Sequence, residues 1–152
     1  MEDITIEEKG WAKINLALHV TGVQEDGYHI LDSFVVFADI FDRLIIKRAR
    51  KTVLTFTGEF SEALNVERNS VVDALELFRG NLTDHFSINI EKNLPIGAGL
   101  GGGSADAAAI IRFITNYCDK SLPNPEDLSK LGADIPACIF NSSARVGGIG
   151  ES

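Results

Sequence analysis

The chain has 152 residues, 45% of them hydrophobic, with a formal net charge of −8 and a sequence pI of about 4.8. This length predicts one domain with a real core, and no apolar run reaches the ~18 residues of a membrane span. The acidic balance argues against a surface that coats nucleic acid, which needs clustered Lys and Arg. The acidic start, Met1-Glu2-Asp3, lacks the basic-then-apolar order of a secretory signal, so we expect a cytoplasmic protein.

The first half of the chain is rich in predicted strands. Polar and apolar residues alternate over residues 12–21, which predicts a half-buried strand with Lys13 and Asn15 on its polar face. Ala12, Ile14 and Leu16 fall on the opposite, apolar face. A turn at residues 25–27 follows. Further strands are expected at residues 30–38, 43–47 and 53–56.

The second half mixes helices with strands. Asn69 is a suitable N-cap for a helix over residues 70–78. The pattern then predicts a strand at 86–90, a long helix at 104–117, a short helix at 126–131 and short strands at 138–140 and 144–146. This order predicts an α+β fold with a mostly antiparallel sheet. The chain stops after a glycine-rich stretch, residues 147–152, without a closing element, and we expect a second domain to begin there.

The two cysteines, Cys118 and Cys138, are far apart in the sequence. Neither belongs to a CxxC motif or a Cys/His cluster, so metal binding is not expected. We interpret both as reduced cysteines of the core.

The most informative segment is a glycine-rich loop, which contains five glycines in the seven residues 97–103. Glycine allows positive φ angles and a close approach of the backbone to a ligand. The loop lies between a predicted strand and an Ala-rich helix, and a helix N-terminus favours anions. We therefore predict a phosphate-binding loop, with the hydroxyl of Ser104 near a phosphate or Mg²⁺. Asp106 either stabilises the helix end or helps to hold the metal.

Three known phosphate loops fit this segment less well. A Walker loop is excluded because no Gly-Lys-Ser/Thr follows. Gly97, Gly99 and Gly102 satisfy the dinucleotide GxGxxG spacing, but the preceding strand is half-polar and no second strand ending in an acid follows. A protein-kinase loop is followed by a strand, whereas a helix is expected here.

The loop sequence Pro95-Ile96-Gly97-Ala98-Gly99-Leu100-Gly101-Gly102-Gly103-Ser104 resembles that of the GHMP kinases. Three other segments strengthen the resemblance: Ala12-Lys13-Ile14-Asn15-Leu16, Asp26-Gly27-Tyr28-His29 and Leu131-Gly132-Ala133-Asp134-Ile135-Pro136. The resemblance implies that residues 1–152 form the GHMP N-terminal ATP-binding domain, with the two-layer fold of ribosomal protein S5 domain 2. It also implies that the C-terminal GHMP domain is absent from this chain and would pack on it.

The resemblance further implies an activity, the transfer of the ATP γ-phosphate to a small alcohol. The four segments together are similar to those of family members that phosphorylate a cytidine diphosphate-linked alcohol in the non-mevalonate isoprenoid pathway. Lys13 would be the catalytic lysine and Asp134 the base for the acceptor hydroxyl. Asn15 would orient the substrate, and Tyr28 and His29 would bind its cytidine end, by stacking and by hydrogen bonding respectively.

The implied cofactors are ATP and Mg²⁺, with the metal near Ser104. Asn69 would border the adenine. The implied ATP-binding residues are otherwise those of the loop: Pro95, Ile96, Gly97, Ala98, Gly99, Leu100, Gly101, Gly102, Gly103, Ser104 and Ala105.

Three alternatives stay open at this point. The chain could belong to another small-molecule kinase of the same superfamily, which would not recognise cytidine. It could be a binding module without catalysis, since related folds occur in RNA-binding proteins. The third alternative, a nicotinamide dehydrogenase, is disfavoured by the half-polar strand before the loop.

Overall fold

The computed structural model describes residues 4–23, 25, 29–62, 69–97, 99–141 and 144–148; for 17–23, 29–33 and 144–148 it describes the backbone only. The strands are β1 (Thr5–Val23), β2 (His29–Ala49), β3 (Val53–Thr57), β4 (His85–Glu91) and β5 (Ala144–Gly148). The helices are α1 (Ser70–Glu76), α2 (Gly102–Tyr117), α3 (Pro125–Leu131) and α4 (Ile135–Phe140). The predicted α+β class is confirmed.

The strands form a single mixed sheet in the order β1-β2-β4-β3, with β5 also paired to β2. The β1–β2, β2–β4 and β2–β5 pairs are antiparallel, and only β3–β4 is parallel. The sheet is thus mostly antiparallel, as predicted. The dinucleotide interpretation of the glycine loop needs a mostly parallel sheet, so this topology argues against it.

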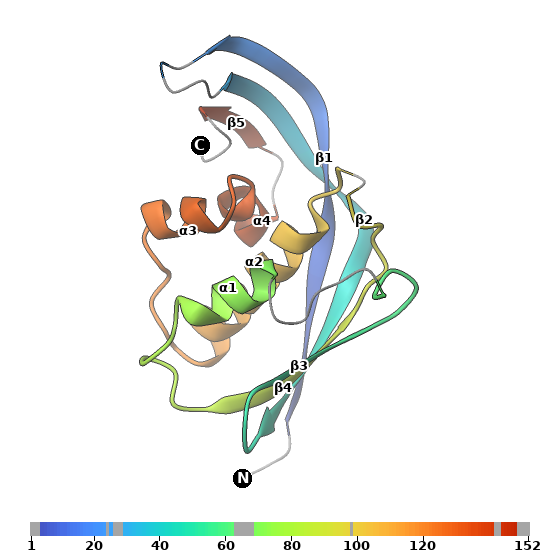
Figure 1. Cartoon of the computed structure of the whole chain (residues 1–152), viewed down its shortest axis with the longest axis vertical. Coiled ribbons are helices and arrows are strands. Elements are labelled where there is room, and N and C mark those ends of the chain that lie inside the picture. The colour runs from blue at the N-terminus through green and yellow to red at the C-terminus, as the bar shows by residue number, and fades with distance from the viewer. Residues whose placement is uncertain are drawn as a thin grey trace.

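The helices cover one face of the sheet, which gives two layers (Figure 1). The core lies between these layers and is centred on α2, whose buried face includes Ile110, Ile111, Phe113 and Ile114. Phe113 meets Phe86 of β4 edge to face, with ring centroids 5.0 Å apart. Because α2 is fixed along its length by this core, its N-terminus is held rigidly at one end of the sheet.

Two predicted strands proved to be one. The strands expected at residues 30–38 and 43–47 are parts of β2, which pairs along most of its length with β1. The β1–β2 pairing has register shifts between Trp11 and Lys13 and between Asn15 and Ala17. Such irregularities turn successive side chains away from strict alternation.

The register shifts overturn the predicted faces of the first strand. Lys13 was expected on an exposed polar face, but it is only 3% exposed, and its neighbour Ala12 is fully buried. Leu16 was expected on the apolar face, but it is 62% exposed. The strand was correctly predicted, but its two faces were not.

The predicted strand at residues 138–140 is also wrong, because these residues form the end of α4. Pro136 stands in the first turn of this helix, where a missing N–H group costs little. The long helix begins at Gly102, earlier than predicted. Among the described residues, no helix is both long and apolar enough to cross a membrane.

Candidate functional site

The glycine loop joins β4 to α2 and borders a hollow of about 300 Å³. Gly97, Gly99 and Gly101 have φ angles of 75°, 75° and 65°, in the left-handed region that disfavours other residues. A Cβ atom at Gly97 or Gly99 would meet nothing within 4 Å. Glycine is therefore required at these two positions by the path of the backbone, which leaves the loop's inner side open to a ligand.

The N-terminus of α2 opens onto the same hollow. Its N-cap residue, Gly101, provides no side-chain hydrogen bond to the first turn. Ala105 N–H already donates to Gly101 O at 2.7 Å, whereas the amides of Gly102, Gly103 and Ser104 precede that bond. Free amides at a helix N-terminus attract anions, so this end of α2 suits a negatively charged group.

Lys13 of β1 is attached to this loop through both its backbone and its side chain. Its N–H donates to Leu100 O at 2.8 Å. Its aliphatic stem packs on Gly101, where an added Cβ would lie 3.2 Å from Lys13 Cε. The ammonium group donates to Asn15 Oδ1 at 3.3 Å. A lysine remote in sequence from the loop therefore has its charge fixed beside it.

Asp134 supplies the counter-charge to Lys13. It occupies the N-cap position of α4, and its Oδ2 lies 3.5 Å from Lys13 Nζ. The carboxylate makes no side-chain cap hydrogen bond to its own helix, and it is 43% exposed. It therefore faces Lys13 and solvent, an arrangement suited to a group that accepts a proton from a bound molecule.

Two more segments reach the loop. Asn69 caps α1, its Oδ1 accepting from the amides of Val71 and Val72. The neighbouring Ser70 Oγ would lie 3.5 Å from a Cβ atom at Gly103, so the start of α1 lies against the loop. Asn69 thus lies next to a residue that contacts the loop, while its own side-chain oxygen caps the helix.

Ser104 lies in the first turn of α2, facing the turn that precedes Asp134. Its Oγ would lie 3.5 Å from a Cβ atom at Gly132. The structure thus places the serine hydroxyl between the glycine loop and the segment of the predicted base.

The residues predicted to hold the cytidine end are described only in part. Tyr28 lies outside the described residues, as does Ala98 of the loop. His29 is described only as backbone, at the start of β2 and paired with Val23. Asn15 is exposed, and its side-chain oxygen accepts from Lys13. The β1–β2 hairpin bends over the helix layer at its far end (Figure 1).

A buried charged cluster beneath the loop was not predicted. Lys92, just after β4, donates to Asp106 Oδ2 of α2 at 2.6 Å and to Asp42 Oδ2 of β2. Asp42 Oδ1 accepts from the amides of Asn93 and Leu94 at 2.6 and 2.9 Å. In the sequence, Asp42 stands out only as an acidic residue within the mostly apolar stretch 40–46. Nothing in the sequence around Lys92 indicated that this residue would be buried. Asp106, left open between a helix-end role and a metal role, faces Lys92 instead.

Burial and the neighbouring charges shift the pKa values of Lys92 and Asp106. Removal from water raises the pKa of Asp106 well above its ordinary value, and the Asp42 carboxylate adds to this against the opposing effect of Lys92. Burial alone would lower the pKa of Lys92, but its two carboxylate partners raise it overall.

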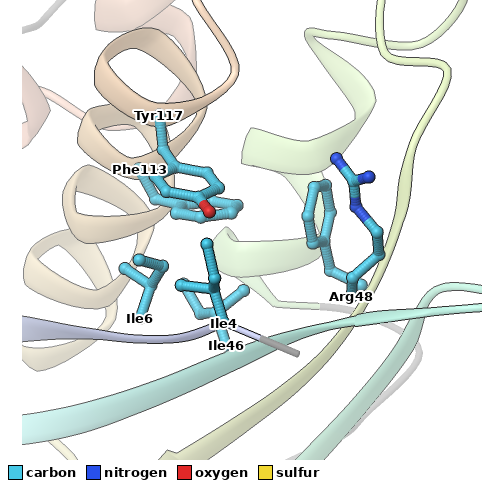
Figure 2. Close-up of a pocket in the computed structure, with 7 residues that line it drawn as sticks. Ile4, Ile6, Ile46, Arg48, Phe113 and Tyr117 are labelled. Atoms are coloured by element: carbon cyan, nitrogen blue, oxygen red, sulfur yellow. The ribbon is translucent and has the colours of Figure 1, made fainter. Parts of the chain in front are cut away.

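The loop hollow is not the only cavity along the described part of the chain. A second one, of about 210 Å³, lies near the opposite end of α2, with Phe113 and Tyr117 stacked over Ile4 and Ile6 (Figure 2). Its charged lining residue is Arg48, which already pairs with Asp84 at 3.0 Å. Apart from the Tyr117 hydroxyl, this cavity is lined by apolar side chains and by an arginine that is already paired, so the glycine loop carries the candidate site.

The fit of a magnesium ion was tested on the donors around the loop. Among the described residues, no three His, Cys, Asp or Glu side chains are grouped so as to hold a metal. Asp106 is engaged by Lys92, which leaves the Ser104 hydroxyl and the partly exposed Asp134. Magnesium is commonly held by one or two protein groups together with substrate phosphates. The two donors near the loop fit a magnesium ion that is bound together with phosphates, rather than one bound by protein ligands alone.

Comparison with known proteins gives a consistent result. The sequence profile of the GHMP kinases N terminal domain matches residues 69–147. The protein named 4-diphosphocytidyl-2-C-methyl-D-erythritol kinase from Cereibacter sphaeroides is 43% identical over 140 residues, which cover 92% of this chain and 50% of that protein. The protein of the same name from Rhizobium johnstonii is 46% identical over 156 residues, covering 97% and 51%.

A solved structure extends the similarity to the fold. The crystal structure of 4-(cytidine 5'-diphospho)-2C-methyl-D-erythritol kinase superposes with a TM-score of 0.80 at 30% identity, covering 96% of this chain and 53% of that one. The chain thus spans about half the length of the relatives it matches. Its GHMP N-terminal fold, expected from the sequence, is confirmed. The profile match and the shared fold show that this chain belongs to the GHMP kinases.

Proposed function

We propose that this chain is the N-terminal, ATP-binding half of an enzyme that phosphorylates the 2-hydroxyl of 4-diphosphocytidyl-2-C-methyl-D-erythritol. The observation that carries the proposal is the meeting of the glycine loop, Lys13 and Asp134 at one end of the sheet. The relatives of the same name, at 43% and 46% identity, support the choice of substrate.

ATP binds with its phosphates along the glycine loop. The loop residues 95–105 supply free amides and the N-terminus of α2, both of which stabilise negative charge. Asn69 and the start of α1 border the nucleoside, because Ser70 lies against Gly103. Phosphoryl transfer depends mainly on such positioning and on charge neutralisation.

Lys13 and Asp134 act at the acceptor hydroxyl. Asp134 takes the hydroxyl proton as the oxygen bonds to the γ-phosphorus and the bond to the bridging β-phosphate oxygen breaks, which leaves ADP. The Lys13 ammonium group, 3.5 Å from Asp134, neutralises charge that develops on the transferred phosphoryl group. Its fixed position against Gly101 keeps this charge next to the loop.

The other substrate contacts follow from the family. Asn15, which accepts from Lys13, orients the acceptor, and Tyr28 and His29 bind the cytidine end. The Ser104 hydroxyl, together with the ATP phosphates, would hold magnesium, which would supply further charge neutralisation. A C-terminal GHMP domain packs on this one and completes the site. The cytoplasmic location and the absence of nucleic-acid partners stay predictions from the sequence.

The test is substrate competition in this chain joined to its C-terminal half. We expect ADP release from Mg-ATP only in the presence of 4-diphosphocytidyl-2-C-methyl-D-erythritol, and competition by cytidine diphosphate against this acceptor. Release with mevalonate or an amino-acid alcohol, unaffected by cytidine diphosphate, would assign the chain to another GHMP activity. ATP binding without any acceptor turnover would leave a nucleotide-binding module.

A further inference from the structure

The buried cluster of Asp42, Lys92 and Asp106 has no part in the mechanism above. Each of its side chains is at most 3% exposed. Lys92 donates to both carboxylates, at 2.6 Å to Asp106. Asp106 Oδ1 is buried and has no hydrogen-bond partner among the described residues. Three ionisable groups in a core are costly to desolvate, and apolar residues of similar size often give equal stability.

The cluster joins the two ends of the glycine loop. At the start of the loop, Asp42 Oδ1 accepts from the amides of Asn93 and Leu94. At its end, Asp106 lies in the first turns of α2 and accepts from Lys92. Asp42 and Lys92 are themselves bonded. A continuous chain of polar contacts thus runs from Leu94 to Asp106 beneath the segment that the loop spans.

The cluster also touches the loop directly. Lys92 lines the hollow that the loop borders. Its Nζ would lie 3.6 Å from a Cβ atom at Gly102, the first residue of α2. The Lys92 ammonium group, paired with its carboxyl partners, therefore lies beside the first residue of α2.

Neighbouring packing holds the cluster tightly. Gly10 of β1 lies against the Asp106 carboxyl group, so that an added Cβ would collide with Asp106 Oδ1 and lie 3.2 Å from its backbone nitrogen. Leu94 is 1% exposed and packs against Gly102. The cluster thus has little room to rearrange, which suits a fixed support for the loop.

We propose that Asp42, Lys92 and Asp106 form a positioning unit that holds the glycine loop in its phosphate-binding shape. The inference rests on the proposed binding of ATP. The unit touches the loop rather than the acceptor hydroxyl, so it sets the affinity for the nucleoside triphosphate and leaves the acceptor site alone.

The first test uses Lys92→Met in the chain joined to its C-terminal half. We expect the KM for ATP to rise about tenfold, the KM for the acceptor to change less than about twofold, and kcat at saturating ATP to stay within about threefold. A loss of folded protein alone would lower kcat per mole and leave the KM for ATP unchanged. Lys130→Met is the matched control, because Lys130 forms an exposed ion pair with Glu126 on α3, and it should change none of these constants.

Loss of one member of a buried ion pair destabilises the fold, so a second variant combines Lys92→Met with Asp42→Asn and Asp106→Asn and leaves no charge in the cluster. The amide oxygen that Asp42→Asn introduces can still accept from the Asn93 and Leu94 amides. We expect this variant to fold and to show the same rise in the KM for ATP. A folded variant with an unchanged KM for ATP would overturn the inference.

Amide hydrogen exchange without nucleotide separates this inference from the proposed function. In both variants, we expect exchange to accelerate at least about tenfold in residues 96–103 and to stay unchanged in α1, whose cap is independent of the cluster. Unchanged exchange in the loop would overturn the positioning role whatever the activity. Failure of the unmodified protein to bind ATP would instead overturn the proposed function.

Discussion

Lys13 Nζ lies 3.5 Å from Asp134 Oδ2, although the two residues come from opposite ends of the chain. The lysine side chain is 3% exposed and the aspartate side chain 43%. The carboxylate of the pair is therefore open to solvent, whereas the ammonium group is buried. Both ends are fixed by other contacts: Lys13 by the Leu100 carbonyl, and Asp134 by its place at the start of α4. The pair can therefore meet a ligand without rearrangement.

Removing either member of this pair should abolish most of the phosphoryl transfer. Lys13→Met retains the aliphatic stem that packs on Gly101 and removes only the charge, while Asp134→Asn retains the shape and removes the base. We expect each to lower kcat by about 10²–10⁴ and to change the KM for ATP much less. Steady-state kinetics with the acceptor measure both constants, and Lys130→Met provides the exposed-lysine control. A variant that retained more than about a tenth of kcat would rule out a catalytic role for its residue.

Gly101→Ala should damage the site more than its backbone strain alone predicts. Gly101 has φ of 65°, and its added Cβ would lie 3.2 and 3.4 Å from Lys13 Cε and Cβ. Gly80 has φ of 84° with nothing within 4 Å, so Gly80→Ala imposes similar strain without a contact. A left-handed alanine costs about 1–2 kcal/mol, which urea unfolding should report for both variants.

Only Gly101→Ala should also lower kcat and raise the KM for ATP, because it displaces both the loop and Lys13, the proposed catalytic lysine. Equal kinetic effects of the two alanines would show that the Lys13–Gly101 contact has no functional consequence. The comparison separates contact from strain because both glycines adopt the same backbone region.

Arg112 should act on catalysis through α4. This largely buried side chain donates to Cys138 O and Ile139 O of α4, at 2.8 and 3.2 Å, and to Lys9 O of β1 at 2.7 Å. It thus ties the end of α4, whose N-cap residue is Asp134, to the strand that carries Lys13. Arg112→Met should lower kcat about 10-fold or more with little change in the KM for ATP, since misplacement of a reacting group is costly.

The readout specific to this role is a double-mutant cycle. If Arg112 acts through the base, Asp134→Asn should lower kcat less in the Arg112→Met background than in the unmodified protein. Additive losses would indicate that Arg112 only stabilises the fold. Arg79→Met, which removes a 79% exposed side chain paired with Glu76, is the control and should leave kcat unchanged.

The Cys138 thiol should react slowly with thiol reagents as long as α4 stays packed against the core. Burial raises the pKa of this thiol to about 12, and Asp134 adds to the effect. At pH 8, a thiol reagent should therefore modify Cys138 only after unfolding, because the thiolate is the reactive form. Cys118 is partly exposed and should react first. Rapid modification of both cysteines in the folded protein would contradict the packing around α4.

The same thiol predicts a change of stability with pH. In the unfolded chain it ionises near its ordinary pKa of 9.0, whereas in the folded protein it stays neutral until about pH 12. Above pH 9 the unfolded state therefore binds fewer protons than the folded state, so this group lowers the free energy of unfolding as pH rises towards 12. Cys138→Ala should reduce this slope in urea titrations at pH 9 and above.

Local sequence patterns predicted much of the fold. Asn69 was correctly predicted as the cap of α1, and the alternation around Phe86 predicted β4. The α+β class followed from the order of such elements. The strand prediction at residues 138–140 was wrong because these residues belong to a helix that starts at Ile135 and buries Cys138 and Ile139. Short apolar runs do not distinguish a strand from a buried helix.

The candidate site was predicted from its glycine loop and from the resemblance, and the structure brings Lys13 and Asp134 together beside that loop. The burial of Lys13 was missed because the register shifts of β1 depend on its pairing with β2. Asp42 and Lys92 were missed for a similar reason. Their pairing with Asp106 joins three elements that are distant in sequence, and no local spacing encodes such a contact.

The central claim is tested most directly by phosphoryl transfer itself. ADP release from Mg-ATP would be measured with and without 4-diphosphocytidyl-2-C-methyl-D-erythritol, for this chain alone and for the chain joined to its C-terminal half. We predict acceptor-dependent release by the joined protein, and its loss in Lys13→Met. Acceptor-dependent release that persists at the full rate in Lys13→Met, or no release with this acceptor by the joined protein, would contradict the account.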